Sequence, residues 1–251
     1  MKKILINIIL FTVSQVLVGQ SSNYEILFKV EFERKLSEEL LEDFKDKRDQ
    51  KLADKEISAY QNPKPEFYSL KLSNNKIETT YIETLDSEAN QSHVSVQNYP
   101  LGKKSYRIKN DTLLYLEHDF NGKTLYSYEN LIDNEWKVTH NDSIILGYKV
   151  FEISRVSDEG VIKAWVTKDL PEGLGIYKYS FLEGFIIAIE LHKKPNNAFE
   201  KDIIKVYPYK IKKLKKEIKF KLPKEIYTTE QIKEIYLGRN NVINKSRKIK
   251  N

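Results

Sequence analysis

The chain has 251 residues, of which 40% are hydrophobic and 31% are charged, and it contains no Cys. This apolar fraction is enough for a folded core and excludes a wholly disordered chain. The absence of Cys excludes disulfides, thiolate metal sites and Cys nucleophiles. Beyond the N-terminus, no apolar run reaches the ~18–20 residues of a membrane-spanning helix, so we expect no transmembrane segment in the mature chain.

The net charge of +6 is distributed unevenly along the chain. From Lys210 to the C-terminus there are 12 Lys and 2 Arg against 4 Glu, whereas residues 21–209 are net acidic. The basic character therefore belongs to the C-terminal segment. This distribution argues against a nucleic-acid-binding function for the whole protein.

The N-terminus has the pattern of a secretory signal peptide. Lys2 and Lys3 give a positive start, and a short apolar stretch over 4–13 follows. We expect cleavage after Gly19 or Gln20, with an uncleaved anchor or a buried first strand as the alternative. No Cys follows the apolar stretch, which excludes a lipid-anchored lipoprotein. The mature chain is therefore expected in an extracytoplasmic compartment.

A strand and a helix are predicted at the start of the mature chain. Apolar and polar residues alternate within 24–34, which is typical of a half-buried strand. Ser37 precedes two acidic residues, the pattern of a helix N-cap. We predict one long helix over roughly 38–54 with a solvated charged face. Its apolar side is formed by residues at helical spacing: Leu40, Leu41, Phe44 and Leu52.

The chain after Pro63 is rich in short alternating segments separated by turn residues. Asn121-Gly122 is the strongest hairpin turn among them. No helical crossover separates these segments, which favours antiparallel pairing. A capping box at 228–231 predicts a short C-terminal helix. Strands are expected at 67–72, 76–83, 106–108, 113–120, 124–128, 136–139, 144–156, 161–167, 176–181, 185–192 and 203–209.

These patterns predict a mainly β protein with a single curved, antiparallel, meander-like sheet, either a partial barrel or a sandwich. One long N-terminal helix and one short C-terminal helix complete the expected fold. The expected divisions are a signal peptide over 1–20, an antiparallel β domain over 21–222, and a basic C-terminal helix and tail over 223–251.

The sequence contains no familiar catalytic or cofactor signature. The nucleophile elbow, the zinc-binding helix and the phosphate-binding loop are all missing. We therefore predict no catalytic residue, no metal and no cofactor, although strands brought together by the fold are an alternative route to a metal site. The four His lie apart in the sequence, without metal-ligand spacing: His93, His118, His140 and His192.

Two short triplets mark candidate modification sites. Asp111-Thr112-Leu113 and Asp142-Ser143-Ile144 fit the Asp-Ser/Thr-aliphatic pattern of O-glycosylation in some bacterial envelopes, and both are expected where a turn meets a strand. The triplets make Thr112 and Ser143 candidate O-glycosylation sites. Ordinary turn chemistry is the alternative interpretation.

A series of motifs runs from Trp136 to Leu191. Trp136 is followed by Ile145-Leu146-Gly147-Tyr148, then by Ala164-Trp165-Val166-Thr167 with Leu170-Pro171 and Gly173, and then by Leu182-Glu183-Gly184-Phe185-Ile186. This order resembles the GLPGLI family of exported bacterial proteins, as a divergent member. The motif that gives the family its name is retained at Leu182, Gly184 and Ile186, whereas Phe181, Glu183 and Phe185 replace its Gly, Pro and Leu.

The resemblance implies an exported, mostly antiparallel β protein of a Gram-negative envelope, located in the periplasm, at the outer membrane or outside the cell. It implies no biochemical activity. The family-motif residues are interpreted as structural: Trp136, Gly147, Tyr148, Trp165, Pro171, Gly173, Leu182, Gly184 and Ile186.

Elementary physical chemistry supports a structural interpretation of several of these residues. Leu170-Pro171-Glu172-Gly173 has Pro and Gly at the positions that a type I turn favours. Gly184 within an apolar run indicates a bulge or a close backbone approach. Trp165 is expected to cover one end of the sheet, and 185–191 to form a central strand.

Two classes of function remain open. The first is a non-catalytic envelope protein that uses a curved sheet to bind an apolar or glycan ligand or another envelope protein. The second is a hydrolase-like extracytoplasmic enzyme with an unrecognised site. The enzyme requires polar side chains to converge in one pocket, and the candidates are His118, His140, Asp169 and Glu183.

The segment 210–222 is strongly basic, with seven Lys and one Glu. Its apolar residues fit either a helix or a strand. One interpretation is that the lysines protect an exposed strand edge from pairing with other chains. The other is contact with an anionic surface such as a phosphorylated envelope lipid.

Overall fold

The computed structural model describes residues 23–47, 49–73, 75–83, 101–120, 122–131, 135–216, 218–220, 225–237 and 247–248. The expected signal peptide over 1–20 lies outside the described residues, as do His93, Asn121 and most of the C-terminal tail. Signal-peptide cleavage therefore stays a prediction.

The described strands form one open, mostly antiparallel sheet in the order β13-β12-β6-β5-β4-β3-β2-β1-β11-β10-β9-β8-β7. Their bounds are β1 Asn23–Leu36, β2 Glu66–Ser73, β3 Lys76–Ile82, β4 Lys104–Ile108, β5 Leu113–Phe120, β6 Lys123–Asn130, β7 Lys137–Ile145, β8 Tyr148–Ser157, β9 Gly160–Thr167, β10 Phe185–Lys193, β11 Phe199–Leu214, β12 Glu225–Thr228 and β13 Arg247–Lys248. The predicted mainly β, meander-like class is confirmed.

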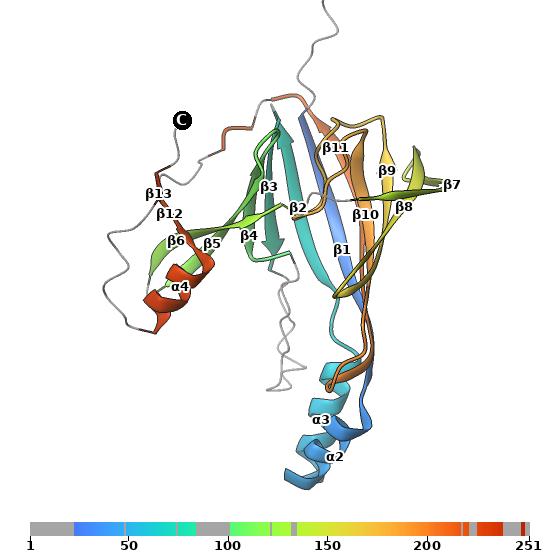
Figure 1. Cartoon of the computed structure of the whole chain (residues 1–251), viewed down its shortest axis with the longest axis vertical. Coiled ribbons are helices and arrows are strands. Elements are labelled where there is room, and N and C mark those ends of the chain that lie inside the picture. Colours follow the sequence, from blue (N-terminus) through green and yellow to red (C-terminus); the bar gives the residue numbers. More distant parts are fainter. Residues whose placement is uncertain are drawn as a thin grey trace, which may run out of the picture.

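Two meanders, β1 to β6 and β7 to β11, are joined by the pairing of β1 with β11. This ladder runs from the Asn23–Leu214 pair to the Leu36–Phe199 pair and so links the two ends of the β region. β12 pairs with β6 in parallel, which is the exception to the antiparallel rule among the described strands. Figure 1 shows β1, β2 and β11 in the middle of the curved sheet, with β5 and β6 on one side and β7 on the other.

The main core lies on one face of this sheet. In β1 the buried Ile26, Phe28 and Val30 alternate with side chains that point to the opposite face, here called the outer face. The segment 168–184 between β9 and β10 adds apolar side chains such as Ile176 to the same core cluster. The sheet thus has a covered core face and an outer face rich in charged and aromatic residues.

The prediction of one long helix over 38–54 is wrong. The chain forms two helices, α2 Glu38–Lys47 and α3 Gln50–Gln61, and the Asp49 side chain caps the second by accepting from the Lys51 N–H. Ser37 caps the first, as predicted, by accepting from the Leu40 N–H at 3.2 Å. Because the chain turns at Asp49, Leu52 is 40% exposed, and Ala53 takes its place against Phe44.

The third helix lies near the C-terminal end of the described chain. It is α4, Thr229–Tyr236, and the expected capping box between Thr228 and Gln231 is present. In Figure 1, α4 lies beside β6, whereas α2 and α3 project beyond the end of β1.

Two predicted strands differ from the structure. Residues 176–181 form no strand, because Ile176 and Tyr179 are buried in the irregular segment that covers the core face. The expected strand over 144–156 is divided by a turn at Leu146 and Gly147, both with positive φ. The prediction that 185–191 is a central strand is confirmed, since β10 lies between β9 and β11.

Candidate functional site

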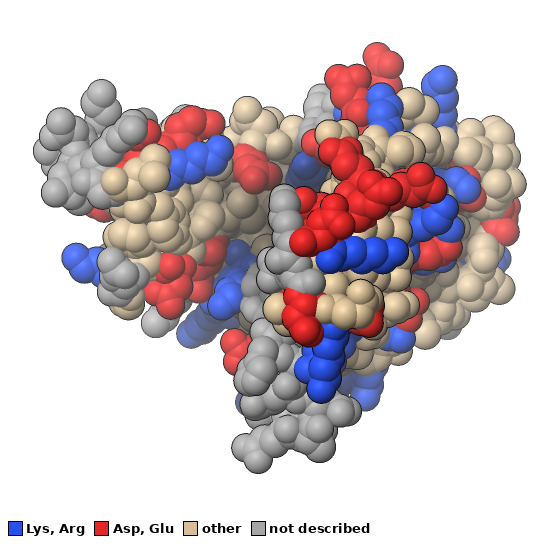
Figure 2. Space-filling model, turned by 90° about the horizontal axis from the view of Figure 1, so that it is seen from below, with Lys and Arg blue, Asp and Glu red and all other residues tan. Residues whose placement is uncertain are grey.

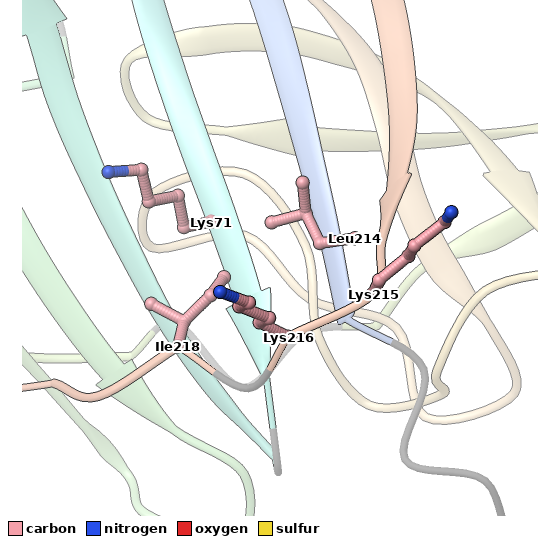
Figure 3. Close-up of a pocket in the computed structure, with 5 residues that line it drawn as sticks. All are labelled: Lys71, Leu214, Lys215, Lys216 and Ile218. Atoms are coloured by element: carbon pink, nitrogen blue, oxygen red, sulfur yellow. The ribbon is translucent and has the colours of Figure 1, made fainter.

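A shallow hollow of about 560 Å³ lies where β11 ends and extends across the end of β1 to β2. Figure 3 shows Lys71 on β2, and Lys215 and Lys216 on the chain that leaves β11, around the aliphatic side chains of Leu214 and Ile218. We call these five residues the basic hollow. It combines three ammonium groups with an apolar lining.

The β-sheet register sets the position of Lys71. Lys71 pairs with Glu25 of β1, which in turn pairs with Lys212 of β11. Directly paired residues point to the same face of a sheet. Glu25 accepts from Lys212 Nζ at 3.1 Å and from Ser69 Oγ at 3.3 Å. Lys212 is therefore compensated by Glu25, while Lys71 stands beside this pair on the outer face.

A buried hydrogen-bond chain holds the other side of the hollow. The Ile218 N–H donates to Ser73 Oγ at 3.3 Å, and Ser73 Oγ donates to Asn23 Oδ1. Ser73 is fully buried at the end of β2. These two hydrogen bonds attach the segment after β11 to the ends of β1 and β2, and so place Lys215 and Lys216 near Lys71.

Within the described part of the chain, no carboxylate forms an ion pair with any of the three lysines of the basic hollow. By contrast, Lys201 and Lys205 both pair with Glu33 on the same face of β1 and β11. Lys71 lies opposite Glu25 of β1 and Glu78 of β3 without an ion pair to either. Cations that form no ion pair within the described residues, around an apolar lining, can attract a group that is negatively charged and partly hydrophobic.

The strand register separates the two interpretations of 210–222. β11 continues as a strand to Leu214, but its pairing with β10 ends at Val206. Lys210, Lys212 and Lys213 therefore lie on a half-open stretch of strand, where lysines oppose edge pairing. Lys215 and Lys216 follow the strand, where no ladder remains to protect, so edge protection does not explain them.

Charge is segregated along the length of the molecule. Asn23 of β1 lies beside Leu214, while the other end of β1 leads into α2. Thirteen residue steps of a strand put these ends roughly 40–45 Å apart. Seen from the helical end, acidic side chains gather over the tip of the molecule (Figure 2). The acids of α2 include Glu38, Glu39, Glu42, Asp43 and Asp46.

Several family-motif residues have the structural roles that the sequence predicts. Ile186 is fully buried in the core. Gly184 is buried, and a Cβ there would lie 2.4 Å from Val166 Cγ1 and 2.9 Å from the Thr167 carbonyl oxygen. The close backbone approach expected at Gly184 is therefore present. Trp136 Nε1 donates to the Ser180 carbonyl at 2.9 Å, and Tyr148 packs against the core.

A buried arginine secures the turn that contains Pro171 and Gly173. Arg107 of β4 donates to the Gly173 and Tyr179 carbonyls, both at 3.1 Å. It is 4% exposed, and burial lowers the pKa of Arg107 to about 10. Arg107 thus fastens 168–184 to the first meander. No sequence pattern predicts this contact, because the partners of Arg107 are backbone atoms.

Two family-motif residues differ from the simple structural picture. Leu182 is 84% exposed, so it contributes nothing to the core. Trp165 does not cover an end of the sheet. It lies partly buried on the outer face of β9, with its ring 5.7 Å from that of Tyr207 on β11.

The candidate O-glycosylation residues are both exposed. Thr112 directly precedes β5, at the turn-to-strand junction expected for it. Ser143 instead lies inside β7, beyond an irregularity between Val138 and Asp142. A strand conformation makes Ser143 less adaptable to a modifying enzyme than Thr112.

The side chains proposed for an enzyme do not converge. His118 lies on β5 and His140 on β7, on opposite sides of the sheet in Figure 1, while Asp169 and Glu183 are exposed on the segment between β9 and β10. His118 Nε2 is 2.7 Å from the buried Ser127 Oγ, and burial lowers the pKa of His118. Ser127 is fully buried, so its hydroxyl is not accessible to a substrate.

One polar cluster had no signal in the sequence. Lys104 Nζ on β4 lies 3.6 Å from Glu78 and 3.7 Å from Glu117, and Tyr106 donates to Glu117 at 3.1 Å. The lysine thus lies between the two carboxylates. In the described residues, no group of three or more His, Asp or Glu is arranged to hold a metal ion.

None of the described helices has the length and apolar character needed to cross a membrane. No protein-family model matches the chain, and neither does any curated protein. Two solved structures of PNGF-II, in the C2 and P21 space groups, are similar to it in fold, with 14% and 15% identity and TM-scores of 0.49 and 0.48. The alignments cover 86% and 85% of this chain, which spans 33% of the length of each PNGF-II chain.

Proposed function

We propose that this chain is an exported, non-catalytic envelope protein that docks on a phosphorylated envelope lipid through the basic hollow. The observation that carries the proposal is a group of three lysines around Leu214 and Ile218 that form no ion pair with a carboxylate of the described residues. Phosphate groups satisfy the lysines, and the aliphatic lining tolerates the adjoining acyl or glycerol groups.

The charge segregation supports a defined orientation. On an anionic surface the basic end of β11 is attracted, and the acidic helix α2 is repelled. The sheet would then stand on the surface with its helical end outward. Export is motivated by the N-terminal pattern around Lys2 and Lys3, and N-terminal sequencing of secreted material that begins at Met1 would contradict it.

Co-sedimentation with vesicles tests the docking. The full chain is mixed with phosphatidylcholine vesicles that contain 30% phosphatidylglycerol, as ~30% anionic lipid gives a strongly negative surface. We expect binding at low salt that falls steeply as ionic strength rises. The triple variant Lys71→Gln, Lys215→Gln, Lys216→Gln should lose sedimentation and keep its circular dichroism spectrum.

The matched control removes three lysines from the helical end: Lys45→Gln, Lys51→Gln, Lys55→Gln. This control changes the net charge by the same amount but should sediment like the wild type. If both triple variants lose binding equally, the attraction is general and the hollow is not the site. If the hollow variant aggregates instead, its lysines protect against self-association, and the docking proposal is wrong.

The alternative of a hydrolase-like enzyme has less support. His118, His140, Asp169 and Glu183 lie apart, and the basic hollow contains no group that could act as a general acid or base at neutral pH other than lysine. The geometry of the described residues therefore favours binding.

A further inference from the structure

Four partly exposed aromatic rings lie together on the outer face of the sheet. We call them the aromatic row: Phe67, Trp165, Tyr207 and Tyr209. Trp165 and Tyr207 have ring centroids 5.7 Å apart, and Phe67 meets Tyr209 edge-on at 5.8 Å. The strand register relates the two pairs, because Lys29 of β1 is the partner of both Tyr207 and Phe67.

A small residue on β10 lets Trp165 and Tyr207 meet across that strand. Ala188 of β10 pairs with Trp165, and the next residue, Ile189, pairs with Val206. Ala188 is therefore the β10 neighbour of Tyr207 on the outer face, and its methyl group leaves room for the rings on each side to meet. The row spans the adjacent strands β9, β10, β11, β1 and β2, a length of roughly 19 Å at the usual strand spacing.

The groups around the row are charged but compensated. Lys29 pairs with Glu31 at 2.5 Å, and Lys205 pairs with Glu33 at 3.2 Å and with Glu190 at 3.7 Å. These ion pairs offer hydrogen-bond donors and acceptors beside the rings. Burial, together with nearby Glu190 and Glu31, raises the pKa of Tyr207 to about 12, so its hydroxyl remains a donor at neutral pH.

We propose that the aromatic row is a binding platform for an uncharged oligosaccharide. The C–H groups on one face of a sugar ring are polarised positively and stack on the negative face of an aromatic ring. The ion-paired lysines and glutamates beside the row can bond to sugar hydroxyls. Tyr and Trp also bind at a low entropic cost because their side chains have few rotatable bonds.

The site is distinct from the basic hollow. Phe67 and Lys71 lie on the same face of β2 but four residues apart, which is roughly 13 Å. A lipid-docking site and a sugar platform on the same face would allow the protein to hold an uncharged glycan close to an anionic surface. Separate variants can test the two sites independently.

Trp165 provides the readout. The chain has 2 Trp, so Trp136→Phe leaves Trp165 as the single reporter. The full chain with this change is titrated with uncharged hexasaccharides of glucose, mannose and N-acetylglucosamine, and with an anionic galacturonic acid hexasaccharide. We expect at least one uncharged hexasaccharide to shift the Trp165 emission to shorter wavelength, with no loss of binding at high salt.

Variants of the row then test the contact. Tyr207→Ala should weaken binding at least tenfold, and Tyr207→Phe less than threefold. Tyr236→Ala, which removes a 48% exposed ring that packs on Phe120 of β5, is the matched control and should bind normally. The Lys71, Lys215, Lys216 triple variant should also retain sugar binding, so failure of vesicle docking leaves this result unaffected.

The proposal is overturned if no uncharged hexasaccharide shifts the emission at millimolar concentration while the circular dichroism spectrum is native. It is equally overturned if Tyr207→Ala binds like the parent. A tighter, salt-sensitive interaction with the galacturonic acid hexasaccharide would show that the face selects an anion. Sedimentation with uncharged vesicles that is lost in Tyr207→Ala would show that the row is a membrane contact.

Discussion

At the scale of single residues, Gly184 is a motif residue whose role is steric: the position has no room for a side chain. The position of a hypothetical Cβ, 2.4 Å from Val166 Cγ1, leaves no room for a side chain between β10 and β9. Gly184→Val should therefore destabilise the protein by about 1–3 kcal/mol, the usual cost of overpacking, or more. Urea denaturation measures the change in the free energy of unfolding.

The control for Gly184 is Gly122→Ala, where nothing lies within 4 Å of the added Cβ. Gly122 has a φ of +73°, so the substitution carries backbone strain but no clash. If Gly184→Val proves less damaging than Gly122→Ala, the close approach is not what makes glycine necessary at 184.

A second residue-scale prediction concerns the ion pair at the helical end of the sheet. Burial alone would raise the pKa of Asp202, but hydrogen bonds from Lys193 and Arg34 outweigh it and hold that pKa below its ordinary value of 3.8. A carboxylate with a lowered folded-state pKa stabilises the fold above its unfolded pKa, and the stabilisation is lost as pH falls through the folded pKa. The contribution of Asp202 should thus be complete at neutral pH and disappear below about pH 4.

Asp202→Asn tests this dependence. The side chains of Arg34 and Asp202 are only 5% and 3% exposed, so the substitution leaves a buried cation and should cost about 3–5 kcal/mol at pH 7. The loss should shrink as pH falls through the lowered pKa of Asp202, because the wild-type carboxylate then also loses its charge. Asp169→Asn, at an exposed position, should change stability little at either pH, and an equal effect of both substitutions would contradict the assignment.

At the scale of elements, the two-helix arrangement gives a prediction that one long helix would not. Phe44 is 9% exposed and stacks near Tyr60 with a centroid distance of 5.6 Å, whereas Leu52 is 40% exposed. Phe44→Ala should cost about 3 kcal/mol. Leu52→Ala should cost less than about 0.5 kcal/mol, because the side chain makes little core contact. Equal costs in chemical denaturation would favour one continuous helix.

The structural role of β11 differs along its length. Its first part lies between β10 and β1, whereas the part after Val206 pairs with β1 alone. The sequence left 210–222 open between helix and strand because its apolar residues fit both periods. The neighbouring β1 resolves that ambiguity as far as Leu214, since a strand partner satisfies the backbone hydrogen bonds that a helix would satisfy internally.

At the scale of the whole molecule, the ladder between β1 and β11 predicts cooperative unfolding. It connects β1, the first strand of one meander, with β11, the last strand of the other. If one meander unfolded alone, the other would lose the strand that pairs with its β1 or β11. We expect a single thermal transition, with the same midpoint by far-ultraviolet circular dichroism and by tryptophan fluorescence. Both Trp belong to the second meander region, so two different midpoints would show that the meanders unfold separately.

Four features were predictable from the amino-acid sequence: the β class, the antiparallel connections, the caps at Ser37 and Thr228, and the need for glycine at 184. These features depend on local periodicity and on backbone conformation, which a short stretch of sequence encodes. The break between α2 and α3 was missed because the charged residues around Asp49 are as compatible with a helix as with a cap.

The positions of the basic hollow and the aromatic row follow from the tertiary structure and could not be predicted from the sequence. Lys71 and Lys215 are far apart in the chain, and their proximity follows from the ladder of β1 with both β2 and β11. Tyr207 meets Trp165 across Ala188 for the same reason. Strand pairing between distant segments has no local sequence signal, because any alternating strand can pair with any other until the whole sheet fixes the register.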